Sequence, residues 1–365
     1  MKIQDITSFL ESFAPPSLQE SYDNAGLLTG EAQWECTGAI TCLDATEPVV
    51  LEAIEKKCNL IIAHHPIIFS GLKKVNSSTY IGRSVITAIK NDIAIYSIHT
   101  NLDHVIDGVN GRMADRLGLI NRRVLMPKGN ILKKLVTYVP HSHAAQVRDA
   151  VLAAGAGEIG QYSECSFNSK GDGTFKANDG AKPFVGQVGL RHTEQETKIE
   201  TIFPAWREGE IRRALINAHP YEEVVYDIYP LENSEEQVGS GLLGELSVAL
   251  DETAFLHLLK EQFELEVIRH TPFMGRTVKK IALCGGAGSF LIGAAIASGA
   301  DFYVTGDVKY HEFFDANAKI VIADIGHYES EQFTQHLLVD ILTEKFPNFA
   351  VQKTQVKTNP VNYFG

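Results

Sequence analysis

Apolar runs alternate with amphipathic stretches over the first 125 residues. Three runs have the length and content of buried strands: 39–43, 60–63 and 93–98. The apolar positions that flank them recur with helical spacing, and these stretches are 6–13, 49–54 and 81–89. Continuous apolar strands that alternate with helices predict a parallel sheet covered on both faces.

Residues from about 240 to the end repeat this pattern. Further strand-like runs lie at 281–284, 302–305 and 320–323, and Gly326 precedes a helical stretch that carries Phe333, Leu337, Leu338 and Ile341. The fold class predicted for the two ends of the chain is therefore α/β. We expect two related α/β lobes, residues 1–126 and 237–365, which together form one domain.

The middle of the chain, residues 127–236, follows a different order. A strand at 132–139 and a helix near Val147 come first, and the Gly/Asp/Asn-rich stretch 168–183 then indicates a hairpin with a long tip. A strand, a helix and a strand follow, at 198–203, 211–218 and 224–229. This order predicts a ferredoxin-like α+β domain inserted between the lobes.

Composition and charge narrow the class of protein. The chain has 365 residues, 44% of them hydrophobic, and a formal net charge of -12 without a Lys/Arg-rich block. This charge argues against binding to nucleic acid or to an anionic membrane. The five cysteines form no CxxC motif, and the first residues carry acidic groups within their apolar pattern, unlike a signal peptide. We expect a cytoplasmic protein with reduced thiols.

Two adjacent histidines end the second apolar run. His64 and His65 inside a regular strand would point to opposite faces of the sheet. Pro66 ends the strand at once, so both rings are free to point off its carboxyl end. Two neighbouring metal ligands are one interpretation, and one capping histidine beside one buried histidine is the other.

A carboxylate follows the third run. Asp103 lies in the segment HTNLD, a few residues after the strand that ends near His99. Carboxylate beside imidazole suits Zn, Mn, Fe or Co. His99 is a candidate for general acid–base catalysis or for supporting a ligand. The alternative is that Asp103 caps a turn or the helix that begins near Gly108.

His327 and Glu331 form the most specific pair. Their spacing of four places both side chains on one face of a helix. The alternative is a solvated first turn in which the helix dipole favours Glu331. All three clusters follow predicted strands, and ligands gather at the carboxyl ends of strands in α/β sheets. We therefore predict two divalent metal ions per subunit, with Glu331 as the bridging ligand because its two oxygens can contact both.

Two further segments are candidates for substrate binding. Gly286 and Gly288, in CGGAGSFL, follow a strand as the glycines of a phosphate-binding loop do, although tight packing between strand and helix also explains them. The segment TGDVKYHE, residues 305–312, gathers ionisable groups after a strand. Its Lys309 and Tyr310 are candidates for binding a small anionic ligand, and His311 for acid–base catalysis; surface decoration is the alternative.

Five segments together resemble a known family. YDNAGLL (22–28), AHHP, HTNLD, TGDVKYHE and GHYESE are similar to the signature segments of the NIF-three-like proteins, which are often labelled GTP cyclohydrolase I type 2 homologues. The resemblance implies a dinuclear metal centre. It implies His64 and Asp103 on one ion, His65 and His327 on the other, and Glu331 on both.

The resemblance extends to the inserted domain. Its last segment, AHPYEEVVYDIYPL (218–231), looks like the CutA/PII-like insertion of longer bacterial members. This implies trimeric packing and a homohexamer, a toroid of two stacked trimers whose metal sites face an internal cavity. The ending VKTNPVNYF (356–364) departs from the usual family ending, and we expect it to lie away from the site.

A metal-dependent hydrolase that acts on a nucleotide or another phosphorylated or cyclic metabolite is the leading functional hypothesis. Opening a purine ring, as the cyclohydrolase label requires, has no independent support among these residues. The competing hypothesis is a non-catalytic protein for metal storage, metal delivery or regulation, in which the inserted domain senses a ligand or partner.

Overall fold

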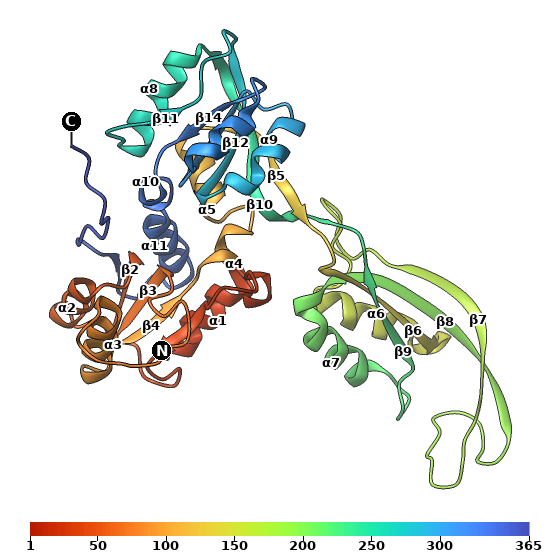
Figure 1. The fold of residues 1–365 in the computed structure, drawn as a ribbon. Helices are drawn as coiled ribbons and strands as arrows, with labels where there is room; N and C mark the ends of the chain where they lie inside the picture. The colour runs from red at the N-terminus through yellow and green to blue at the C-terminus, as the bar shows by residue number, and fades with distance from the viewer. Residues whose placement is uncertain (365) are drawn as a thin grey trace. The chain divides into compact units, whose positions relative to one another are not determined.

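Residues 1–364 are described by the computed structural model. Two segments distant in sequence, Met1–Met126 and the chain from Gln237 onward, fold into one unit, and Pro127–Glu236 form a second (Figure 1). None of the helices in these residues combines the length and apolar character that crossing a bilayer requires.

A five-stranded sheet lies in the first unit. Its strands, in spatial order, are β1 (Gly26–Thr29), β4 (Ala94–Ser97), β3 (Leu60–His65), β2 (Ala39–Asp44) and β15 (Val351–Lys353). All neighbours are parallel except β1 and β4. Alternate residues of β3 pack on opposite faces, against α1 (Ile3–Phe13) on one side and against α2 (Glu47–Glu55) and α3 (Tyr80–Lys90) on the other. The covered parallel sheet predicted from the apolar runs is confirmed.

A six-stranded sheet lies in the same unit. Its order is β11 (Arg269–His270), β14 (Val321–Asp324), β13 (Phe302–Gly306), β12 (Val278–Ala287), β10 (Glu235–Leu250) and β5 (Ile120–Lys128). Strands β12, β13 and β14 are parallel. Helices α8 (Glu252–Phe263) and α9 (Ile292–Ala297) contribute to the cores on its two faces. The strand expected at 281–284 is longer at both ends and spans Val278–Ala287, with an irregular register between Leu283 and Ala287 where Gly286 takes a φ of +65°.

The two sheets exchange elements near the ends of the two chain segments. Helix α5 (Val109–Arg116) and β5 belong with the six-stranded sheet, whereas α11 (Thr334–Lys345) and β15 belong with the five-stranded sheet. The lobes are therefore not the contiguous segments 1–126 and 237–365. The helix expected after Gly326 is also two helices, α10 (His327–Glu331) and α11. Apolar periodicity identifies these elements but does not say which sheet covers them.

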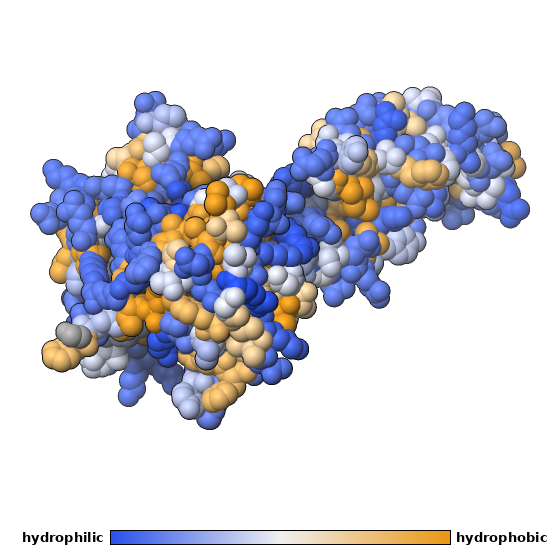
Figure 2. Space-filling view, turned by 90° about the horizontal axis from the view of Figure 1, so that it is seen from above, coloured by the Kyte–Doolittle hydropathy of each residue, from blue (hydrophilic) through white to orange (hydrophobic). Residues whose placement is uncertain are grey.

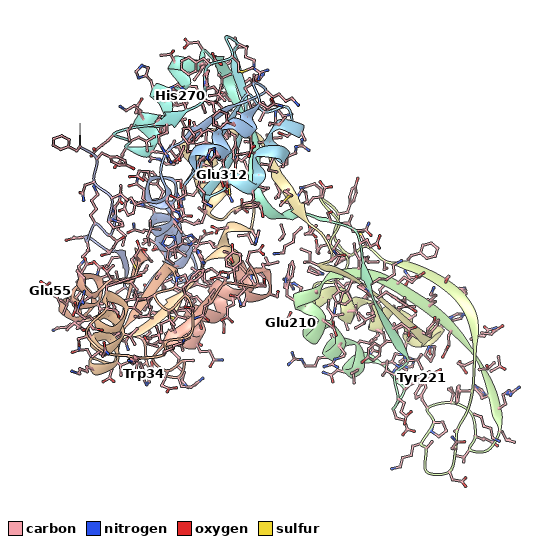
Figure 3. All side chains as sticks on the ribbon, viewed as in Figure 1. Trp34, Glu55, Glu210, Tyr221, His270 and Glu312 are labelled. Atoms are coloured by element: carbon pink, nitrogen blue, oxygen red, sulfur yellow. The ribbon has the colours of Figure 1, made fainter. Side chains whose placement is uncertain are left out.

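The second unit has one antiparallel sheet. Its elements follow in the order β6 (Leu132–Pro140), α6 (Ala144–Ala153), β7 (Phe167–Lys176), β8 (Arg191–Pro204), α7 (Glu208–Ala218) and β9 (Tyr226–Leu231). The strands lie side by side as β7-β8-β6-β9. Both helices pack in one apolar cluster with the sheet. The order of strands and helices expected for residues 127–236 is confirmed; Tyr221, which follows α7, is labelled in Figure 3.

Candidate metal centre

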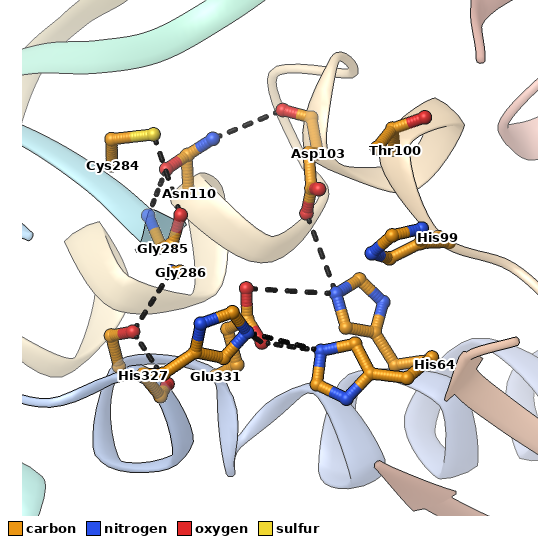
Figure 4. Close-up of polar contacts among 12 residues, drawn as sticks. His64, His99, Thr100, Asp103, Asn110, Cys284, Gly285, Gly286, His327 and Glu331 are labelled. Carbon is orange, nitrogen blue, oxygen red and sulfur yellow. Dashed lines mark hydrogen bonds and ion pairs between the residues drawn. The ribbon is translucent and has the colours of Figure 1, made fainter. Parts of the chain in front are cut away.

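Ends of three parallel strands bring the predicted ligands together in the first unit. His64 and His65 are the last two residues of β3, and Asp103 ends α4 (Thr100–Asp103), shortly after β4. His327 and Glu331 are the first and last residues of α10, which follows β14. Figure 4 shows Glu331 between His327 and His64, and its dashed lines join one nitrogen of His64 to both Asp103 and Glu331. The segments far apart in sequence therefore meet at one place.

The first group of possible ligand atoms comes from His64, Asp103 and Glu331. The Nδ1–H of the buried His64 donates to the carbonyl of Ile98 at 2.9 Å, which leaves Nε2 as the free nitrogen. That nitrogen lies 3.6 Å from Asp103 Oδ1 and 3.8 Å from Glu331 Oε1. His64 Nε2 and Asp103 Oδ1 are both buried without a hydrogen-bond partner among the described residues. Two facing, buried acceptors fit a cation between them.

The second group comes from His65, His327 and Glu331. The Nδ1–H of His65 donates to Asp44 Oδ1 at 2.9 Å, and that of His327 donates to Asp307 Oδ2 at 2.7 Å. Their Nε2 atoms lie 2.9 and 3.2 Å from Glu331 Oε2 and 3.3 Å from each other. A carboxylate that holds Nδ1–H while Nε2 faces inward is the usual arrangement of histidines that bind metals.

Glu331 is the residue that the two groups share. Its side chain is buried, and each carboxylate oxygen faces a different group: Oε1 faces His64, and Oε2 faces His65 and His327. The backbone of Gly286 lies directly against Oε1, in a conformation with φ +65°. A carboxylate held in this way can contact two ions at once.

Electrostatics couple these groups strongly. Burial disfavours the charged form of Glu331, but His327 and the other two imidazoles hold the pKa of this carboxyl well below its usual range. Burial and the charge of Glu331 raise the pKa of Asp103 well above its usual range. Burial opposes protonation of His65 and His327, yet their carboxylate partners raise the pKa of His65 to about 10 and that of His327 to about 9. The cluster thus attracts positive charge.

Replacing Gly286 by alanine is expected to disturb the centre through Glu331. The added Cβ would overlap Glu331 Oε1, and the positive φ at this position disfavours any side chain. We expect metal affinity to fall about 10- to 100-fold, the range known for changes that misplace a ligand. Gly293→Ala, in α9, is the control, because an added Cβ there meets nothing within 4 Å. Titration of both metal-free proteins with Mn²⁺ measures the difference; equal affinities would contradict this prediction.

Asp44 and Asp307 hold two of the candidate ligands, His65 and His327, and neither carboxylate is among the residues predicted from the sequence. Asp44 ends β2 and is in register with His65 of the neighbouring strand. Asp307 directly follows β13 and takes a positive φ of 54°. Both lie just past or at the end of a parallel strand, as the predicted ligands do. The same strand-end rule includes them among the acidic residues that follow strands, but it does not distinguish them from the others.

His99 lies beside the two groups and is oriented by Asp23. Its Nδ1–H donates to Asp23 Oδ1 at 2.8 Å, and the backbone N–H of Thr100 donates to the other oxygen at 3.0 Å. Its ring centroid is 5.3 Å from that of His64 and 5.5 Å from that of His65. Together with these two histidines it forms a third set of possible ligand atoms. His99 is therefore placed either to move a proton or to take part in metal binding.

A cavity of about 1120 Å³ opens onto these residues. Many of its charged lining residues are acidic: Glu20, Asp44, Asp103, Asp307, Asp324, Glu329 and Glu331. Arg269 also lines it, and its guanidinium is paired with Asp324 and donates to the carbonyl of Val308 at 3.1 Å. The chain's ending contributes Asn359, Pro360, Val361 and Tyr363 to the lining. The expectation that this ending lies away from the site is therefore wrong.

Lys309 and Tyr310, both expected to bind an anion, do not line this cavity within the described chain, and neither does His311. Lys309 is highly exposed and immediately precedes the 3-10 helix η5 (Tyr310–Ala316), which Tyr310 and His311 begin and whose Glu312 is labelled in Figure 3. The N–H groups of Gly286 and Gly288 donate to the hydroxyls of Ser330 and Thr305 at 2.9 and 3.0 Å. These N–H groups are thus already satisfied within the protein.

Comparison with known proteins gives consistent matches over the chain. The family described as Duf34/NIF3 (NGG1p interacting factor 3) matches residues 1–360. A Halalkalibacterium halodurans protein called GTP cyclohydrolase 1 type 2 homolog is 40% identical, covering 99% of this chain and 98% of its own. A Bacillus subtilis protein of the same name is 39% identical, with the same coverage of both chains. The crystal structure of a Bacillus cereus protein related to NIF3 has a TM-score of 0.88 and 38% identity, covering 100% and 99% of the two chains.

Proposed function

The chain belongs to the Duf34/NIF3 family, and we propose that it is a dinuclear metal protein that works as a hydrolase. In this proposal His64 and Asp103 hold one ion, His65 and His327 hold the other, and Glu331 contacts both. The observation that carries the proposal is the position of the Glu331 carboxylate, whose two oxygens face separate groups of ligand atoms. The imidazole and carboxylate donors suit Zn, Fe, Mn or Co.

Divalent ions held there supply Lewis acidity, which polarises a phosphoryl or carbonyl oxygen and lowers the pKa of a water molecule. The chain's own residues do the rest. Asp23 fixes the His99 ring so that its Nε2 can accept or return a proton in the cavity. Arg269 is a cationic lining residue that can contact an anionic substrate group. We assign anion binding to Arg269 and the ions, in place of Lys309, Tyr310 and the glycine loop.

The acidic cavity restricts the substrate. Seven carboxylates line it, so an anion is repelled unless ions offset their charge. A phosphorylated or cyclic metabolite therefore has to present its reacting group to the ions. The name shared by the relatives makes nucleotides the first compounds to test.

A second candidate function is metal storage, delivery or regulation. The observation that favours it is a cavity of about 1190 Å³ within the inserted unit, between its β7–β8 hairpin and Tyr221. We propose that this unit is a ferredoxin-like domain of the CutA/PII kind that binds a ligand or partner. In that case the metal centre would exchange ions without chemical turnover.

We further propose a homohexamer, a toroid of two trimers. Three aromatic side chains on the first unit are largely exposed: Phe290 at 63%, Tyr310 at 73% and Phe314 at 68%. The face of this unit seen in Figure 2 carries a patch of hydrophobic residues. Exposed patches of this kind are typical of subunit interfaces. Light scattering coupled to gel filtration tests the proposal, and a monomer would contradict it.

The hydrolase proposal is tested by turnover. Protein with a measured metal content is incubated with nucleotides, phosphoesters and cyclic amides, and products are followed by chromatography. We expect turnover that disappears in Glu331→Gln while the assembly is unchanged. Turnover that persists in this variant would come from a contaminant. Absence of turnover, together with fast metal exchange, would favour storage or delivery.

A further inference from the structure

Residues 354–363, which follow β15, form hydrogen bonds with several elements of the first unit. After β15, the hydroxyl of Thr354 donates to the Glu52 carboxylate on α2, and the backbone N–H of Gln355 donates to Glu52 Oε1 at 2.9 Å. Glu52 is buried, and Val356 packs against the apolar cluster beneath α2 and α3. This anchor holds the following residues at the end of β2, next to the metal centre.

Thr358 contacts the carboxylate that orients a predicted ligand. Its hydroxyl donates to Asp44 Oδ2 at 2.9 Å, while Asp44 Oδ1 accepts the Nδ1–H of His65 at 2.9 Å. Both oxygens of Asp44 are thereby engaged, so the carboxylate cannot rotate away without losing a bond. A fixed Asp44 fixes the tautomer and the direction of the His65 ring.

The next residues reach the helix that carries the other ligands. The side-chain amide of Asn359 donates to Glu329 Oε1 at 3.0 Å, and the hydroxyl of Tyr363 donates to the same oxygen at 3.3 Å. Glu329 lies on α10 between His327 and Glu331. The segment is thus bonded to Asp44, which orients His65 of β3, and to α10, which carries His327 and Glu331.

We infer that residues 354–363 are a working part of the metal centre, and that Thr358 is a positioning residue for His65 through Asp44. This inference rests on the proposed function, because it assumes that His65 binds an ion. The segment is assigned only to the ion that His65 and His327 would hold. In the His64–Asp103 group, the carbonyl of Ile98 is the acceptor that orients His64, and this acceptor lies outside the segment.

The test replaces Thr358 by valine in the full-length protein, which removes the hydroxyl and keeps the shape. Titration of metal-free protein with Co²⁺, followed by visible absorption, reports both affinity and ligand geometry for each ion. We expect the affinity for one ion to fall about 3- to 10-fold, with an altered spectrum, since partners of ligands contribute about 10- to 100-fold and Thr358 acts one bond further away. Asp44→Asn is expected to give the larger, 10- to 100-fold loss on the same ion.

Thr137→Val is the matched control. Thr137, in the other unit, is a fully buried threonine whose hydroxyl donates to the carbonyl of Val225 at 2.9 Å, whereas Thr358 is partly buried and donates at the same distance. Thr137→Val should lose at least as much stability as Thr358→Val, without a change in Co²⁺ affinity or spectrum. A Thr358→Val protein that binds both ions as the unchanged chain does would overturn the inference alone. An unchanged chain that binds fewer than two ions would overturn the proposed function and the inference with it.

Discussion

A Glu331→Gln protein is expected to bind neither ion tightly, with each affinity at least about 100-fold weaker than in the unchanged chain. The substitution keeps the shape of the side chain but removes its charge and one of its two acceptor oxygens. Glu331 is the one described residue shared by the His64–Asp103 and the His65–His327 groups. Losing it leaves two protein ligands for each ion, which is too few for a stable site.

The loss of metal binding should also reduce the stabilisation of the folded protein by added metal. An ion at a concentration 1,000 times its dissociation constant stabilises the folded protein by about 4 kcal/mol. We therefore expect added Mn²⁺ to raise the melting temperature of the unchanged chain and to have little effect on Glu331→Gln. Metal content after dialysis, measured by mass spectrometry, checks the same point directly.

Glu252→Gln is the control for this substitution. Glu252 is also a buried glutamate, but its oxygens accept the backbone N–H groups of Met274 and Gly275 at 2.7 and 2.9 Å. It should cost about 1 to 3 kcal/mol of stability, as a buried hydrogen-bonded group does, and leave the metal content unchanged. If Glu331→Gln kept two ions, Glu331 would not bridge them.

The positions of the candidate ligands could be predicted from the sequence for a simple reason. His64 and His65, Asp103 and the His327–Glu331 pair each follow an apolar run, and ligands gather at the carboxyl ends of parallel strands. The strands belong to two sheets, because β3 and β4 lie in the five-stranded sheet and β14 lies in the six-stranded one. The strands themselves could be predicted because a buried parallel strand leaves an unbroken apolar run.

The supporting residues could not be selected in the same way. Many acidic residues follow strands, and Asp44 differs from the rest only because the register pairs it with His65. The register depends on how two strands pair, and the local sequence pattern of either strand does not contain this information. Likewise, α11 and β15 follow the six-stranded sheet in sequence but complete the core of the other one. Their apolar faces would suit either sheet.

In the segment after β13, by contrast, residues predicted from the sequence do not line the cavity. Lys309, Tyr310 and His311 gather ionisable groups after a strand, as a site does, but the chain turns at Asp307 into η5 and leaves Lys309 and Tyr310 exposed. Of this segment, Asp307 is the residue that accepts a hydrogen bond from a candidate metal ligand, the Nδ1–H of His327. The density of ionisable groups therefore predicted the loop, and Asp307 is the residue of that loop that contacts the candidate centre.

Asp103→Asn and His327→Gln are each expected to lose one ion and keep the other. Asp103 faces only His64 and Glu331 within the first group, whereas His327 belongs only to the second. The metal content should fall from about two ions to about one in either variant, and the remaining affinity should change less than about tenfold, because the other group keeps all three of its side chains.

Electron paramagnetic resonance of the Mn²⁺-loaded proteins separates these variants from Glu331→Gln. Two ions joined by one carboxylate couple magnetically, so the unchanged chain should give a broadened signal and each single variant the signal of an isolated ion. His99→Gln is the decisive comparison, because His99 can also group with His64 and His65. If it keeps two coupled ions, His99 acts on protons beside the metals; if it loses one, the ligand assignment has to be redrawn around His99 in place of Asp103 or His327.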